Sequence, residues 1–292
     1  MESYDFSDLL RRGVFNDRPA VLAIGVFDGV HRGHASIMRT LKTEAVKRGA
    51  LSVVISFSVN PKKQATGQLD TLRLRSAYVS SFGIDLFVVI DFSEDFSKIT
   101  SRGFISLLAK AFKPVAVVVG TDFRFGNPSD AASGKDVPSL FAEKGIDCSA
   151  TIVKPVLDRE GNKISSTYLR QKINSGELGT FLELSGQSYR VDLSMLEYRS
   201  GSKGLTLCRT SIHQLLPPAG TYEGLVLLSD GRQARCALTL DEDHLVLSDS
   251  SLLPDGGTGE VTGKLRLDSI FLVRKKDDHK RTESRGSAQV RQ

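Results

Sequence analysis

The feature that most constrains this sequence is an alternation of short apolar runs and amphipathic stretches over its first 180 residues. The apolar runs are rich in β-branched residues and nearly continuous, as strands covered on both faces of a parallel sheet must be. These expected strands are Val21–Phe27, Leu51–Phe57, Asp85–Ile90, Val115–Gly120 and Asp147–Val153. The expected helices between them are His34–Arg48, Thr71–Phe82, Ser101–Phe112 and Val137–Lys144. This order predicts a doubly wound α/β domain with a parallel sheet, in which ligands bind at the carboxyl ends of the strands.

After residue 186 the pattern changes to short β-type stretches separated by frequent turn signals. The stretches are Thr221–Leu228, Arg235–Leu240, His244–Leu247 and Ile270–Arg274. Turns at this spacing predict a small antiparallel β-barrel domain. We therefore expect an α/β domain over residues 1–185, a β-barrel domain over residues 186–275, and a tail over residues 276–292.

The net charge of +5 lies mostly at the C-terminal end. From Arg274 onward, seven Lys or Arg residues stand against three Asp or Glu residues, which accounts for +4 of that charge. Because the tail has almost no apolar residues and no interleaved aromatic residues, we expect it to be disordered and predict no nucleic-acid partner.

The remaining composition is typical of a cytoplasmic protein without a membrane partner. The three cysteines, Cys148, Cys208 and Cys236, are odd in number and lack CxxC spacing, which indicates reduced, buried thiols. No apolar run approaches the roughly 20 residues that a membrane span needs. The N-terminal residues show no apolar core of a signal peptide. We expect a cytoplasmic location.

The strongest local signal is GVFDGVHRGH, residues 25–34, which leaves the first expected strand and opens a helix. Free backbone N–H groups and the helix dipole favour a phosphate at such a position. Gly29 and Gly33 permit tight turns and a close approach of the ligand. His31 and His34 could each present an imidazole N–H to phosphate oxygens, and an adjacent polyanion would favour their protonated forms. The alternative is that both histidines only cap the helix or pack beneath the loop.

Two close histidines could also bind a metal ion. No Glu is placed as in HExxH, and no other His or Cys in this domain has ligand spacing. We therefore expect no metal ligands among the protein side chains.

Two further segments carry candidate binding residues. GTDFRFG, residues 120–126, combines a carboxylate, an arginine and two aromatic rings directly after an expected strand, which suits a planar ring system with polar edges. A loop with a phenylalanine in the core would look much the same. ISSTYLR, residues 164–170, offers Ser165 or Ser166 as the cap of a short helix ending at Gly176. Its hydroxyls and Arg170 could also line a triphosphate.

These segments together resemble the N-terminal module of the bacterial bifunctional riboflavin kinase/FAD synthetase family. GVFDGVHRGH resembles the G-x-F-D-G-x-H-x-G-H motif of that family, and SFSVNP, residues 56–61, resembles the segment after its second strand. GTDFRFG and ISSTYLR resemble its G-x-D-F-R-F-G and I-S-S-T-x-x-R motifs. Order and spacing agree over residues 18–186. Two departures are Asn60, where the family often has His, and a slightly longer stretch from Asn127 to Gly134 that leaves the alignment of Asn127 and Asp136 open.

The resemblance implies an FMN adenylyltransferase and assigns roles to individual residues. The residues it places at the ATP phosphates are His31, His34, Ser165, Ser166, Thr167 and Arg170. The residues it places in the turn or near the flavin are Gly25, Phe27, Asp28, Gly33, Phe57, Pro61, Asp122, Arg124 and Asn127. ATP and FMN would be the substrates, FAD the product, and Mg²⁺ the cofactor. An FMN phosphate oxygen would attack the α-phosphorus of ATP, so no protein nucleophile is needed.

The second domain departs from the pattern of the family. Gly186–Tyr189 and Pro218–Tyr222 resemble parts of the riboflavin kinase barrel, but no PTAN segment stands between them. We therefore expect a barrel without kinase activity, whose protein partner is unknown. Three alternatives remain open: a bifunctional enzyme, transfer to another phosphorylated acceptor such as nicotinamide mononucleotide or a pantetheine phosphate, and a non-catalytic flavin or nucleotide sensor.

Overall fold

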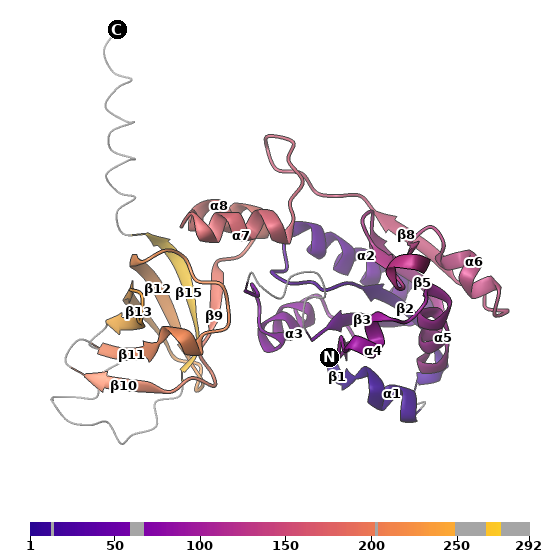
Figure 1. Ribbon diagram of the computed structural model, residues 1–292, viewed down its shortest axis with the longest axis horizontal. Helices are drawn as coiled ribbons and strands as arrows, with labels where there is room; N and C mark the ends of the chain where they lie inside the picture. The colour runs from indigo at the N-terminus through magenta and orange to yellow at the C-terminus, as the bar shows by residue number, and fades with distance from the viewer. Residues whose placement is uncertain (13–14, 59–66, 202–203, 249–266, 276–292) are drawn as a thin grey trace, which may run out of the picture. The chain divides into compact units, whose positions relative to one another are not determined.

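A computed structural model of the chain describes residues 1–12, 15–58, 67–201, 204–248 and 267–275 (Figure 1). The chain divides into two compact units. Unit 1 consists of Met1–Thr66 and Leu72–Ser165, and unit 2 consists of Gly67–Thr71 and Ser166–Gln292. The basic tail after residue 275 lies outside the described residues.

Unit 1 is built on a six-stranded parallel sheet with the order β1-β4-β3-β2-β5-β8. Its strands are β1 (Glu2–Asp5), β2 (Phe15–Ile24), β3 (Leu51–Phe57), β4 (Leu86–Ile90), β5 (Phe112–Gly120) and β8 (Ser149–Val153). The predicted doubly wound α/β class is thereby confirmed. The edge strand β1 was not expected, because its sequence ESYD is polar and its side chains are mostly exposed.

Helices cover both faces of this sheet (Figure 1). They are α1 (Phe6–Arg12), α2 (Arg32–Arg48), α3 (Leu72–Ser80), α4 (Glu94–Ser97), α5 (Ser101–Ala111) and α6 (Val137–Ala142). Apolar residues of α2 and α3, such as Met38 and Val79, share a core with Val21 of β2. On the other face, α1, α5 and α6 share a core with the next residue, Leu22. This alternation along β2 is the reason that an unbroken apolar run was needed.

Unit 2 contains a seven-stranded antiparallel sheet with the order β10-β11-β14-β13-β12-β15-β9. The strands are β9 (Tyr189–Asp192), β10 (Tyr198–Gly201), β11 (Gly204–Cys208), β12 (Gly220–Leu228), β13 (Gln233–Leu240), β14 (His244–Ser248) and β15 (Leu267–Lys275). This curled sheet agrees with the predicted antiparallel β domain. Its buried face is filled by aliphatic side chains, among them Val226, Leu238 and Ile270.

Two helices, α7 (Ser166–Asn174) and α8 (Leu178–Ser185), also belong to unit 2. Helix α8 packs against β9 and β15, and α7 packs against α8. The predicted boundary at residue 185 follows a change in sequence pattern. The second compact unit begins at Ser166, because α8 packs against its antiparallel sheet and α7 packs against α8.

The segment 67–71 is part of unit 2 although the chain reaches it between β3 and α3. The buried Gln214 amide donates from Nε2 to the carbonyl oxygens of Leu69, at 2.7 Å, and Arg190, at 3.0 Å. Its Oε1 accepts from the Asp192 N–H at 2.7 Å. The nitrogen and the oxygen of the Gln214 amide are thus both hydrogen-bonded inside unit 2, and these bonds hold the segment 67–71 there.

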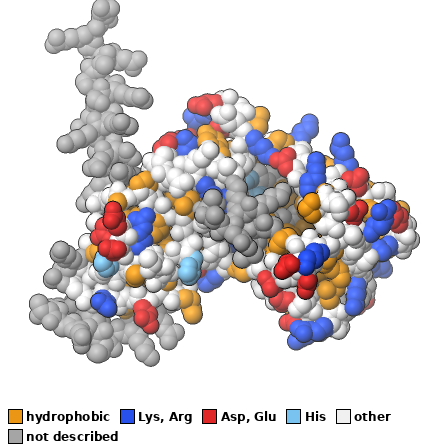
Figure 2. All heavy atoms as spheres, viewed as in Figure 1, with side chains coloured by type: hydrophobic (Ala, Val, Ile, Leu, Met, Phe, Trp, Pro, Cys, Tyr) orange, Lys and Arg blue, Asp and Glu red, His pale blue; other side chains and the backbone are white. Residues whose placement is uncertain are grey.

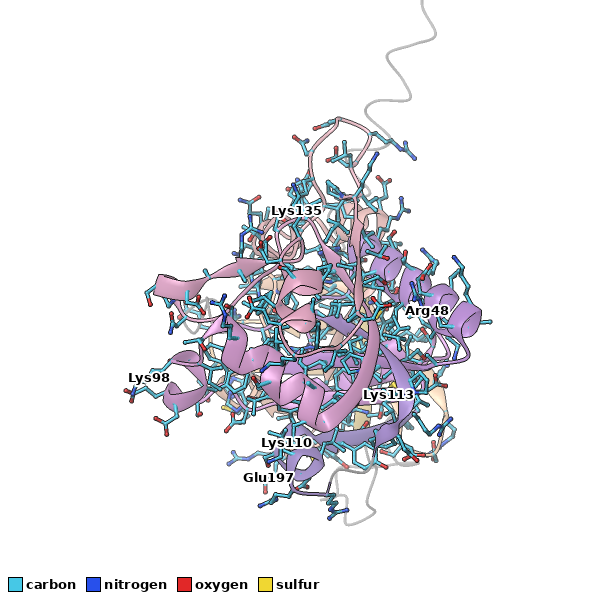
Figure 3. All side chains as sticks on the ribbon, turned by 90° about the vertical axis from the view of Figure 1, so that its right-hand side faces the viewer. Arg48, Lys98, Lys110, Lys113, Lys135 and Glu197 are labelled. Carbon is cyan, nitrogen blue, oxygen red and sulfur yellow. The ribbon has the colours of Figure 1, made fainter. Side chains whose placement is uncertain are left out.

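Charged side chains of both signs are interspersed over the face of the molecule shown in Figure 2. The exposed basic residues labelled in Figure 3 come from separate elements of unit 1 and point outward. They are Arg48 of α2, Lys98 after α4, Lys110 of α5, Lys113 of β5 and Lys135 before α6. None of the helices in the described part of the chain is long and apolar enough to cross a membrane.

Candidate functional site

The candidate site of unit 1 lies where the order of the parallel strands reverses. From β2 the chain runs to β3 and β4 on one side of the sheet, whereas β5 and β8 lie on the other side. Strands β2 and β5 are parallel neighbours, so their carboxyl ends meet at one edge. GVFDGVHRGH follows β2 and GTDFRFG follows β5. The topology therefore brings two of the predicted binding segments to the position where open α/β sheets bind ligands.

The turn after β2 has an unusual backbone. The strand ends at Ile24, three residues earlier than predicted, and the turn begins at Gly25, whose N–H still donates to the Ile55 carbonyl of β3 at 3.1 Å. Phe27 is buried and has a φ of 52°, a left-handed conformation that is uncommon for a bulky residue. A Cβ atom on Gly25 would lie 3.0 Å from the Phe27 ring, so a larger residue there would press on this ring. Such local strain is commonly kept at functional sites.

His31 caps α2 through its own side chain. Nδ1 accepts from the N–H groups of Gly33, at 3.1 Å, and His34, at 3.3 Å. An accepting Nδ1 places the ring proton of the neutral imidazole on Nε2. The capping role that the sequence left as an alternative is thus present, and it also fixes which nitrogen of His31 can donate to a ligand.

His34 stacks on His31, with ring centroids 3.7 Å apart and an angle of 18° between the planes. The edge of Phe27 lies against it at 5.3 Å between centroids. Its Nδ1 is buried and has no hydrogen-bond partner among the described residues. A buried polar atom without a partner costs about 1–3 kcal/mol, which a polar ligand would offset. The turn therefore has the properties of a preformed polar site.

Both imidazoles are held neutral by their surroundings. Burial, assisted by the charge of Lys163, lowers the pKa of His31 to about 4. Burial, followed by the neighbouring His31 and Arg75, places the pKa of His34 well below its ordinary value. The protonated forms expected beside a polyanion thus require the polyanion itself, because its charge has to reverse these effects.

These pKa values predict a stability that falls as the pH falls. The unfolded chain takes up a proton on His31 below its ordinary pKa of 6.5, whereas the folded chain resists protonation until about pH 4. The free energy of unfolding should therefore decrease by up to about 3 kcal/mol between these pH values, and His34 acts in the same direction. Urea unfolding at several pH values would measure this slope, which His31→Asn should reduce. An identical slope in both proteins would contradict the assignment.

The loop after β5 uses its predicted residues in different ways. Asp122 is exposed and forms an ion pair with Lys163. Arg124 is exposed, and its Nη1 donates to the Phe123 carbonyl at 2.8 Å. Phe125 is buried beside other aromatic rings, so one phenylalanine of this loop is indeed a core residue. Asp122 and Arg124 keep polar groups at the surface, where a ligand can reach them.

Asn127 and Asp136 have local structural roles in this loop. The Asn127 side-chain oxygen accepts from the N–H groups of Ser129 and Asp130 and caps a short 3₁₀ helix. The Asp136 carboxylate accepts from the N–H and hydroxyl of Ser133. These hydrogen bonds account for both residues without a ligand, and a ligand role for Asn127 remains a prediction.

The segment after β3 is described only in part. Phe57 is half-buried, with Phe92 and Phe96 edge-on at 5.8 and 6.3 Å between ring centroids. Pro61 and Asn60 lie outside the described residues. The aromatic surroundings of Phe57 suit a flat ring system, and its place near a flavin remains a prediction.

The third predicted segment is shared between the two units. Ile164 and Ser165 belong to unit 1, where the Ile164 carbonyl oxygen lies 3.8 Å from the position of a Cβ on Gly33. Ser166, Thr167 and Arg170 lie in α7 of unit 2. The Arg170 side chain is buried and donates from Nε to the Gly67 carbonyl at 3.3 Å. The phosphate-binding roles of these α7 residues remain predictions.

The turn GVFDGVHRGH, residues 25–34, is called the phosphate turn below after its predicted ligand. Sequence reasoning missed two residues close to it. Lys163 pairs with Asp122 and its charge acts on His31. Arg75 is buried in α3. The spacing carried a signal for Arg75, since it stands four residues before Val79 on the apolar face of the predicted helix. A charged residue in that position needs a buried partner.

No group of three or more His, Cys, Asp or Glu side chains that could bind a metal ion occurs in the described part of the chain. Mg²⁺ commonly binds through few protein ligands, with nucleotide phosphates and water completing its coordination.

Comparison with known proteins decides the family. A family model described as FAD synthetase matches residues 15–168, which is more than half of the chain. This chain belongs to the FAD synthetase family. The matched residues include the phosphate turn, the loop after β5 and the first part of α7.

Curated relatives are bifunctional riboflavin kinase/FMN adenylyltransferases. The Escherichia coli K12 protein is 32% identical over 195 residues, covering 62% of this chain and 60% of the relative. The Listeria monocytogenes protein is 25% identical over 222 residues, covering 71% of this chain and 68% of the relative. The chain thus spans about three-fifths of the length of the E. coli relative.

A solved structure shares the fold. It is described as a macrolide-efflux protein from Streptococcus pneumoniae, with a TM-score of 0.69 and 22% sequence identity. The likeness covers 89% of this chain and 94% of that chain. At this identity the comparison concerns the fold alone.

Proposed function

We propose that this protein is an FMN adenylyltransferase, which transfers AMP from ATP to the phosphate of FMN and releases FAD and pyrophosphate. The observation that supports it most is the phosphate turn at the carboxyl end of β2. There, two stacked neutral imidazoles stand at the start of α2. Membership of the FAD synthetase family supports FMN as the acceptor, as do the half-buried Phe57 and the exposed Asp122 and Arg124.

The proposed reaction needs positioning and neutralisation of charge more than a protein nucleophile. An oxygen of the FMN phosphate forms a bond to the α-phosphorus of ATP, and the bond to the β-phosphate oxygen breaks, so that pyrophosphate leaves. The Nε2–H of His31 would donate to the phosphate oxygens, while the N–H groups of Gly33 and His34 in the first turn of α2 are held by its Nδ1. Mg²⁺ bound with ATP would supply further charge neutralisation. Lys163, paired with Asp122, would add a positive charge beside them.

We further propose that the second domain, predicted over residues 186–275, is a degenerate riboflavin-kinase-like domain without kinase activity. In place of a PTAN segment the chain has GSKGLTLCRTS, residues 201–211, part of which forms β11. The bifunctional reaction of the relatives remains the main alternative, and a non-catalytic flavin or nucleotide sensor is a second. The expected cytoplasmic location stays part of this proposal.

One assay separates these functions. The full-length protein is incubated with ATP and Mg²⁺, together with either riboflavin or FMN, and the flavins are resolved by chromatography. We expect FAD from FMN, while riboflavin stays unchanged. Conversion of riboflavin to FMN or FAD would show that the protein is bifunctional and also phosphorylates riboflavin. If neither flavin reacts, transfer to other phosphorylated acceptors is tested next, and FMN is withdrawn as the substrate.

A further inference from the structure

Arg75 is an arginine of α3 that is almost completely buried beneath the candidate site. Arg75 is 1% exposed, and Asp28, which belongs to the phosphate turn, is 2% exposed. The distance from Arg75 Nη2 to Asp28 Oδ1 is 3.8 Å. A cation thus lies directly behind the turn that is proposed to bind the ATP phosphates.

The same guanidinium is also bound to the end of β3. Its Nη1 donates to the hydroxyl of Ser56, at 3.0 Å, and to the carbonyl oxygen of Phe57, at 2.9 Å. The Ser56 hydroxyl in turn donates to the carbonyl oxygen of Val26, at 2.9 Å. Arg75 therefore reaches the turn twice, once through Asp28 and once through Ser56.

Packing alone does not account for an arginine at this position. Burying a guanidinium and a carboxylate carries a large desolvation penalty, and replacing a buried ion pair by apolar residues is often neutral or stabilising. The neighbouring buried positions of α3 are the apolar Leu74 and Val79. All the partners of Arg75 named above lie in the turn after β2 or at the end of β3, where the two substrates are proposed to bind.

We infer that Arg75 is a positioning residue for both substrates, which holds the phosphate turn and the flavin-side end of β3 in one fixed geometry. The inference rests on the proposed function, because that function places ATP at the turn and FMN near Phe57. Neither substrate touches the buried guanidinium. Its effect reaches them through Asp28, Ser56 and the backbone of Val26 and Phe57.

The charge of Arg75 has a second consequence for the turn. Together with burial and His31, it lowers the pKa of His34. The groups that act on His34 are thus His31 from its own turn and Arg75 from α3. A neutral residue at position 75 should therefore let His34 titrate at a higher pH.

The test uses full-length protein with Arg75→Met, which removes the charge and the donors, and Arg75→Lys, which keeps only the charge. Arg190→Met is the matched control. Arg190 of unit 2 also binds a carboxylate and a serine hydroxyl, at 2.7 Å to Asp268 and 2.8 Å to Ser269. The measurements are the Kd of Mg-ATP by calorimetry, the Kd of FMN by flavin fluorescence, and kcat and KM for FAD formation.

We expect Arg75→Met to weaken the binding of both Mg-ATP and FMN by about tenfold or more, equivalent to about 1.4 kcal/mol each. Arg75→Lys should recover part of the Mg-ATP affinity but not that of FMN, because one ammonium group cannot span Asp28 and the β3 carbonyl together. Arg190→Met should leave both Kd values unchanged, although its melting temperature falls. Folded Arg75→Met with both affinities of the wild type would overturn the inference.

If Arg75→Met does not fold, Arg75→Lys and Ser56→Ala decide the question. Ser56→Ala removes the hydroxyl that links Arg75 to the Val26 carbonyl oxygen, but it leaves the Arg75–Asp28 ion pair. Unchanged Kd values in both folded variants would overturn the inference, whereas a weaker Kd in either supports it. Calorimetry with Mg-ATP does not require turnover. A wild-type protein that binds Mg-ATP but makes no FAD would therefore refute the proposed function without deciding the role of Arg75.

Discussion

Replacing His31 by alanine or by asparagine is expected to lower kcat for FAD formation by about 10²–10³-fold, as the loss of a preorganised donor to developing charge does. The two variants separate the two roles of this residue. Asparagine is among the best N-cap residues, so His31→Asn keeps an acceptor for the N–H groups of Gly33 and His34. It loses the Nε2–H that is proposed to contact phosphate. Steady-state turnover of FMN and ATP measures the effect.

The control variant is His213→Ala, which changes an exposed histidine of unit 2. His213→Ala should keep the activity of the wild type. The His31→Ala variant should in addition lose about 0.5–2 kcal/mol of stability from the missing cap. If His31→Asn is folded and as active as the wild type, His31 only caps α2 and takes no part in the reaction.

Gly33→Ala is expected to lower kcat/KM for ATP by roughly tenfold, because it shifts a proposed catalytic group by less than the 1 Å that can cost 10²-fold. A Cβ atom at position 33 would lie 2.9 Å from Cε1 and 3.0 Å from Nδ1 of His31. Both contacts are tighter than ordinary ones, so the ring must give by a few tenths of an ångström. Such a shift weakens the cap and changes the direction of the Nε2–H together. Kinetics and the Kd of Mg-ATP measure the change.

Gly179→Ala is a closely matched control for this substitution. Gly179 is the second residue of α8, as Gly33 is the second residue of α2. No heavy atom lies within 4 Å of a Cβ built on Gly179. Gly179→Ala should therefore keep full activity and gain up to about 1 kcal/mol of stability from the better helix propensity of alanine. Equal activities of the two variants would show that Gly33 is not needed to place His31.

The sequence alone determined the fold class and the location of the turn between β2 and α2, where phosphate is proposed to bind. The predicted strands at Leu51–Phe57 and Val115–Gly120 coincide with β3 and lie within β5. These predictions succeed because a buried parallel strand requires an unbroken apolar run, a property that neighbouring residues display by themselves. The phosphate turn was equally visible, since its glycines and histidines lie within ten residues at a strand–helix junction.

Only the tertiary structure decided which side chains meet across long stretches of chain. The ion pair of Asp122 with Lys163, the burial of Arg75 behind Asp28, and the capture of segment 67–71 by Gln214 join residues far apart in sequence. Hydrophobic periodicity reports which face of an element is buried, but it does not report which polar partner that face meets. A polar residue such as Arg75 obtains its role from partners on other elements, and the folded chain brings those partners together.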